Sequence, residues 1–225
     1  MFQGKALARV FTGVVLVAGA SLGYATVIYD QSLNTVDNFG YYSDIDGELS
    51  ADSFVLSDAA TVQAISWYGM YEDTASSTPD LFNVEIFSNL SVGLFGDLSA
   101  SSLHSYSGDS VTRSDSGIVD ANGETIYQYT LNLAVGWELK ADTYLLEISN
   151  QNDQYSSWIW ADSVAGNGEF YYRYDAADPW YLDQSGYDLA FLLDDGVPAT
   201  TVSEPGSLFL FGIGCALLAR LRKRS

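Results

Sequence analysis

Short stretches in which apolar and polar residues alternate recur along residues 26–200, and long stretches of helical periodicity are missing. In Thr125–Leu133, the apolar Tyr127, Tyr129, Leu131 and Leu133 share one face. An alternation with a period of two predicts half-buried β-strands. Further strands are expected at Asp52–Ser57, Thr61–Tyr68, Phe82–Phe87, Tyr144–Ile148, Tyr155–Trp160, Glu169–Tyr174 and Asp188–Leu193.

Turn dipeptides separate these stretches, as at Asp46–Gly47 and Asn122–Gly123. The number of short strands predicts an all-β domain, an antiparallel β-sandwich of jelly-roll-like form, over residues 26–200. A β-helix is the alternative, but the chain shows no fixed repeat period.

The two ends of the chain have a different pattern. Residues 1–9 are short and basic, Val10–Ala20 are apolar, and Gly23-Tyr24-Ala25 has small residues at its first and third places. This order is typical of a secretory signal peptide, expected at residues 1–25. An uncleaved N-terminal anchor is the alternative.

The C-terminal residues 201–225 contain three parts in a fixed order. Ser203, Glu204 and Pro205 come first, and an apolar transmembrane helix is expected at about residues 207–221. A basic stop cluster, Arg220, Arg222, Lys223 and Arg224, closes the chain. The excess of positive charge favours the cytoplasmic side for this end, which leaves the middle of the chain outside.

This tail resembles the PEP-CTERM sorting signal, although Ser203 stands where that signal has its first proline. The resemblance implies processing by the membrane enzyme exosortase near Ser203–Pro205 and loss of the helix. It also implies an inner-membrane intermediate followed by release to the cell surface or extracellular matrix of a Gram-negative bacterium that makes exopolysaccharide. A plain C-terminal anchor is the alternative.

The middle of the chain has a looser resemblance to a group of secreted bacterial β-sandwich domains. It is carried by Asp52-Ser-Phe-Val-Leu, Ile65-Ser-Trp-Tyr-Gly69, Tyr127-Gln-Tyr129, Thr143-Tyr-Leu-Leu-Glu-Ile148, Trp158-Ile-Trp160 and Asp188-Leu-Ala-Phe191. This resemblance implies a fold and a location but no activity.

Composition excludes several classes of function. The chain has 29 acidic and nine basic side chains, a net charge of −20, with one His and one Cys. Only three of the basic residues lie between Asp30 and Glu204, where all the acids lie. Nucleic-acid binding is therefore not expected, and neither is a zinc cage, a disulfide framework or a Cys–His nucleophile.

Exposed aromatic residues are the first candidate site. Tryptophan and tyrosine rings stack on sugars while their polar tips stay in water. Trp180 and Tyr181 lie in a predicted loop, and Trp158 and Trp160 share one face of a predicted strand. We therefore expect exopolysaccharide as a partner of these four residues, with core packing as the alternative.

Carboxylates are the second candidate. Asp44, Asp46 and Glu48 alternate along a turn and offer hard oxygen ligands, so a bound calcium ion is a candidate cofactor; solvated acidic turns are the alternative. No catalytic residue is predicted, and His104 is expected in a polar loop. The expected function is that of a non-enzymatic exported surface or matrix protein. A secreted glycosidase-like enzyme and an anchored envelope protein with a protein partner are the alternatives.

Overall fold

The computed structural model describes residues 25–36, 39–45, 47–72, 80–93, 97–151 and 157–196. Fourteen strands lie in these ranges, and no helix does. Strands β1 to β7 are Val27–Gln31, Gly40–Tyr42, Leu49–Leu56, Ala60–Tyr71, Phe82–Val92, Leu98–Gly108 and Val111–Val119. Strands β8 to β14 are Thr125–Leu139, Asp142–Asn150, Trp158–Ser163, Phe170–Arg173, Tyr181–Asp183, Asp188–Leu189 and Phe191–Asp194. The predicted all-β class is confirmed.

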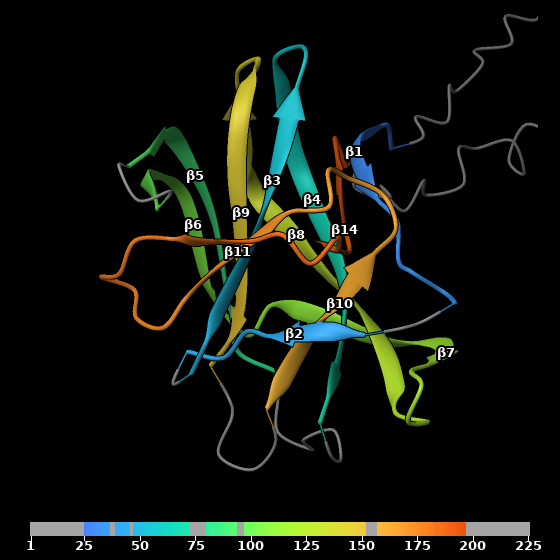
Figure 1. Ribbon diagram of the computed structural model, residues 1–225. Helices are drawn as coiled ribbons and strands as arrows, with labels where there is room; N and C mark the ends of the chain where they lie inside the picture. The colour runs from blue at the N-terminus through green and yellow to red at the C-terminus, as the bar shows by residue number, and fades with distance from the viewer. Residues whose placement is uncertain are drawn as a thin grey trace, which may run out of the picture.

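The strands form two antiparallel sheets, as the sandwich prediction requires (Figure 1). The six-stranded sheet has the order β12-β11-β3-β9-β5-β6. In the eight-stranded sheet, β4 pairs with β8 on one side and with β14 and β10 on the other. Strands β7, β1, β2 and β13 complete that sheet through β8, β14 and β10.

The core between the sheets is rich in aromatic rings. Phe82 of β5 contacts Trp67, Tyr129 and Trp158 of the other sheet, with ring centroids 5.0–5.1 Å apart. A Cβ at Gly69 would overlap the Trp158 indole, so glycine at this position admits the large ring. Such edge-to-face contacts add to the free energy gained by burying the rings.

A second apolar cluster lies on the other face of the six-stranded sheet. Its buried members are Leu49, Ala51, Phe87, Leu98, Leu145 and Trp180. Because alternate residues of a strand face opposite ways, Leu145 lies in this cluster while Leu146 lies in the main core. The connection between β11 and β12 supplies Trp180 and reaches toward β5 and β6 (Figure 1).

The sequence missed two long strands. Residues 98–108 and 111–119 form β6 and β7, and the prediction that His104 lies in a loop is wrong. Five serines in β6 hide its alternation, because serine is common in loops. The His104 ring stacks on Trp137 of the facing sheet, with centroids 5.3 Å apart, and this packing holds it in place.

None of the described residues forms a helix long and apolar enough to cross a membrane. Residues 1–24 of the predicted signal peptide lie outside the described residues. So do the sorting motif Ser203–Pro205 and the predicted helix near residues 207–221. The basic cluster, Arg220 to Arg224, also lies outside them.

Candidate functional site

The hairpin formed by β11 and β12 ends the six-stranded sheet, and its two faces differ in chemistry. Tyr172 pairs with Tyr181 across the hairpin. Side chains alternate between faces along a strand, so Tyr172 and Tyr181 share one face while Arg173 and Trp180 take the other. The same short segment therefore builds two surfaces.

Three tyrosines form the first surface, the tyrosine cluster: Tyr172, Tyr174 and Tyr181. The Tyr172 ring lies 5.7 Å from that of Tyr174 and 5.8 Å from that of Tyr181. Tyr174 is 65% exposed and Tyr181 is 39% exposed. Burial raises the pKa of Tyr172, and the nearby Tyr174, Glu48 and Asp183 raise it further. The cluster thus offers aromatic faces and hydroxyl groups beside carboxylates.

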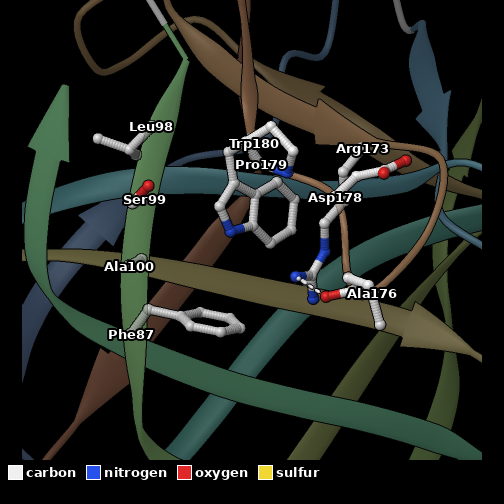
Figure 2. A pocket seen from close by; sticks show the side chains of 10 residues that line it. Phe87, Leu98, Ser99, Ala100, Arg173, Ala176, Asp178, Pro179 and Trp180 are labelled. Atoms are coloured by element: carbon white, nitrogen blue, oxygen red, sulfur yellow. Dashed lines mark hydrogen bonds between the residues drawn. The ribbon is translucent and has the colours of Figure 1, made fainter. Parts of the chain in front are cut away.

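The other face of the hairpin holds Trp180 against the sheet. The Trp180 ring contacts Phe87 at 5.8 Å, and the Arg173 guanidinium lies 4.1 Å from the indole (Figure 2). The backbone of Trp180 exchanges two hydrogen bonds with Leu98, of 2.8 and 3.0 Å. These contacts fasten the β11–β12 connection to β6.

Arg173 also forms a buried ion pair. Its Nη2 donates to Oε2 of Glu147 at 2.6 Å, and its Nη1 donates to the Ala176 carbonyl at 2.8 Å. The side chains are 9% and 5% exposed. Burial raises the pKa of Glu147, and the nearby Glu85 raises it further, while Arg173 opposes both. Removing either partner would leave a buried charge uncompensated.

A groove of about 320 Å³ opens beside this ion pair on the outer face of the six-stranded sheet. We call it the outer groove. Glu85 of β5 lies directly opposite Glu147 of β9 in the strand register. The other lining residues are Ile45, Leu49, Asn83, Ser105, Tyr106, Ser107, Ser149, Arg173 and Ala176. The groove combines two carboxylates and several hydroxyl groups with a few apolar side chains.

A separate pocket of about 370 Å³ lies on the other side of Arg173, next to Trp180 (Figure 2). Strands β5 and β6 supply Phe87, Leu98 and Ala100 to its walls. The β11–β12 connection supplies Asp178 and Pro179. Trp180 itself is only 2% exposed, so little of its ring is available to a ligand without movement of the connection.

Three of the four aromatic residues predicted to bind glycan are not surface residues. Trp158 and Trp160 are 0% exposed and belong to the main core, and Trp180 belongs to the second cluster. Neighbouring strands and the β11–β12 connection cover them, so the exposed tryptophan surface expected from the sequence is absent from the described residues. Tyr181 is exposed as predicted.

Sequence reasoning missed Tyr172 and Tyr174 as site residues. Their alternation with Tyr171 and Arg173 in the predicted strand Glu169–Tyr174 was a usable signal. It shows that the two tyrosines share a face. It does not show which face stays uncovered, because that depends on the path of the connection after Tyr174.

Of the three residues predicted to bind calcium, the structure describes Asp44 and Glu48. Asp44 is buried, and both of its carboxylate oxygens accept the Trp158 backbone N–H, at 2.9 and 3.1 Å. Glu48 lines the sheet end near Asp183, while Asp46 lies outside the described residues. No three His, Cys, Asp or Glu side chains in the described part of the chain are grouped to hold a metal. Calcium binding stays a prediction.

Comparisons with known proteins give no further indication of function: no family model matches the chain, and no curated protein matches its sequence.

Proposed function

We propose that this protein is a non-enzymatic exported component of a bacterial cell surface or extracellular matrix, and that it binds exopolysaccharide. The observation that carries the proposal is the tyrosine cluster. The Tyr172 ring, partly buried against the main core, contacts the rings of Tyr174 and Tyr181, and these two are exposed at the end of the sheet. Exposure of apolar aromatic surface to water is unfavourable, so a cluster of exposed aromatic side chains indicates a binding surface.

The chemistry of the cluster suits a sugar. Tyrosine presents an apolar face to the C–H groups of a sugar ring, while its hydroxyl stays hydrogen-bonded to water or ligand. The adjacent Glu48 and Asp183 offer acceptors for sugar hydroxyl groups. Stacking of a tyrosine ring on a sugar ring would give affinity for many kinds of sugar. Hydrogen bonds to the carboxylates would fix the orientation of the bound sugar.

The proposed location rests on the two ends of the chain. A signal peptide at residues 1–25 would export the protein, and a PEP-CTERM-like tail with Ser203, Glu204 and Pro205 would hold it in the inner membrane until exosortase processes it. The domain over residues 26–200 would then reach the surface or matrix. Its two antiparallel sheets suit the jelly-roll-like sandwich that we propose.

Co-sedimentation with the exopolysaccharide of the producing bacterium tests the function. We expect the full-length protein to bind, and we expect Tyr181→Ala and Tyr174→Ala to weaken binding about tenfold each through loss of a stacking ring. Tyr42→Ala is the matched control, because Tyr42 is 43% exposed but lies outside the cluster. No binding by the wild-type protein would contradict the proposal and favour the anchored envelope protein with a protein partner.

A glycosidase-like enzyme is the second candidate, and one observation favours it. Glu85 and Glu147 face each other on neighbouring strands, and Glu147 is buried. Retaining glycosidases use two carboxyl groups about 5–5.5 Å apart. The enzyme would release reducing ends from the exopolysaccharide, and Glu147→Gln would abolish that release. We expect no release from the wild-type protein.

A further inference from the structure

The outer groove is a second candidate binding site, on the other side of the hairpin from the tyrosine cluster. We propose that the outer groove binds a sugar that carries a free, protonated amino group. The inference rests on the proposed function for the source of the ligand, a polysaccharide, but it concerns different residues. It also names the chemical class of sugar that the domain prefers.

The groove is built from three neighbouring strands. Strand β5 supplies Asn83 and Glu85, β9 supplies Glu147, and β6 supplies Ser105 and Ser107. Its volume of about 320 Å³ falls at the lower end of the range for small-molecule sites. Regular strands hold these side chains at fixed spacing, so the site needs little ordering when a ligand enters.

The charges in the groove select the ligand. Arg173 is neutralised by Glu147 at 2.6 Å. Glu85 has no ion-pair partner among the described residues, whose two ion pairs are Arg113–Asp80 and Arg173–Glu147. One carboxylate therefore remains in excess. An ammonium group beside Glu85 would gain a charge-assisted hydrogen bond, whereas a uronate or sulfate group would be repelled.

The neutral side chains fit the rest of a sugar ring. The Asn83 carbonyl accepts a hydrogen bond from Gln151, and the Ser107 hydroxyl accepts another at 2.9 Å. This arrangement fixes both groups beside Glu85, where they can bond to sugar hydroxyl groups. Ile45 and Leu49 supply apolar surface for the C–H groups of the ring.

The charge of the whole domain points to the same class of ligand. Between Asp30 and Glu204 the chain has 29 acidic and three basic side chains. This field attracts a cationic polymer and repels an anionic one at low ionic strength. Binding of a polymer with free amino groups would also relieve the repulsion among the carboxylates.

Calorimetric titration of the full-length protein with a glucosamine tetramer tests the inference, with the N-acetylglucosamine tetramer as the uncharged analogue. At mildly acidic pH we expect the charged tetramer to bind at least about tenfold more tightly. Glu85→Gln should remove that preference. Glu138→Gln is the matched control, since this glutamate lies at the end of β8, outside the groove, and it should change nothing.

Equal affinity for the two tetramers, or an unchanged preference in Glu85→Gln, would overturn the inference. The experiments distinguish failure of the inference about the outer groove from failure of the proposed function. If the exopolysaccharide binds through Tyr174 and Tyr181 while neither tetramer binds, the inference fails and the function stands. If the charged tetramer binds and the exopolysaccharide does not, the function fails and the groove stands.

Discussion

The two faces of the β11–β12 hairpin both carry aromatic residues, but they differ in exposure to solvent. On one face, Tyr174 and Tyr181 stay exposed, and each contacts the ring of Tyr172. On the other face, Trp180 is buried against β5 and β6, and Arg173 lies over its indole. The residue type does not decide the role of an aromatic ring. The cover supplied by neighbouring segments decides it, and the buried face fastens the hairpin to β5 and β6.

Arg173→Ala gives the largest expected effect on the buried face. It leaves the Glu147 carboxylate buried without its partner and removes the cation over Trp180. We expect a loss of about 3–5 kcal/mol in the free energy of unfolding, measured by urea denaturation. Lys140→Ala, at an exposed basic residue with no ion pair among the described residues, should stay within about 0.5 kcal/mol. A loss below about 1 kcal/mol in Arg173→Ala would show that the ion pair contributes little.

Trp180→Ala should cost about 3 kcal/mol, because it empties the centre of the second cluster. It also enlarges the pocket next to it and loosens the connection from Phe87. The same urea titration measures it, with Tyr181→Ala as the neighbouring control on the exposed face. Equal losses for the two variants would contradict the division of the hairpin into a structural face and a binding face.

We expect the buried Glu147 to make the free energy of unfolding depend on pH. Burial raises its folded pKa above the ordinary value of 4.5, so the folded state keeps the proton more tightly than the unfolded state. Its contribution to stability is full below about pH 4.5 and is lost as the pH rises through the folded pKa. Relative to Glu147→Gln, the wild-type free energy of unfolding should therefore fall over that range, by about 1.4 kcal/mol for each unit by which the pKa is raised. A difference that grows with pH would show instead that the attraction to Arg173 prevails over burial.

Tyr174→Ala should have the smallest effect on stability. Its ring is 65% exposed and contacts that of Tyr172, so we expect a change within about 0.5 kcal/mol. The matching measurement is a thermal unfolding curve beside that of Trp180→Ala. A loss of more than about 1 kcal/mol would mean that the tyrosine cluster serves the fold.

The alternation of apolar and polar residues predicted most of the strands, because a strand with one buried face keeps apolar residues at every second position. It failed in β6, where all five serines are exposed and the adjacent Ser101 and Ser102 interrupt the period of two. It also placed Trp158 and Trp160 together on one face, as the structure has them, without showing that the face is covered. Burial of that face depends on Phe82, which comes from a strand far away in the sequence.

The outer groove could not be predicted from the sequence, for a related reason. Glu85 and Glu147 lie more than sixty residues apart in the chain, and they meet only because β5 pairs with β9 in one particular register. A shift by one residue would turn one of the two carboxylates to the other face of the sheet. Strand pairing and register depend on the whole core, so short-range patterns do not contain them.

The most direct test of the account measures binding and stability on the same samples. The Tyr174→Ala/Tyr181→Ala double variant and the wild-type protein are each titrated with the exopolysaccharide and then unfolded in urea. We expect the double variant to bind at least about tenfold more weakly, while its free energy of unfolding stays within about 1 kcal/mol of the wild-type value. Unchanged affinity in a stably folded double variant would contradict the tyrosine cluster as the binding surface.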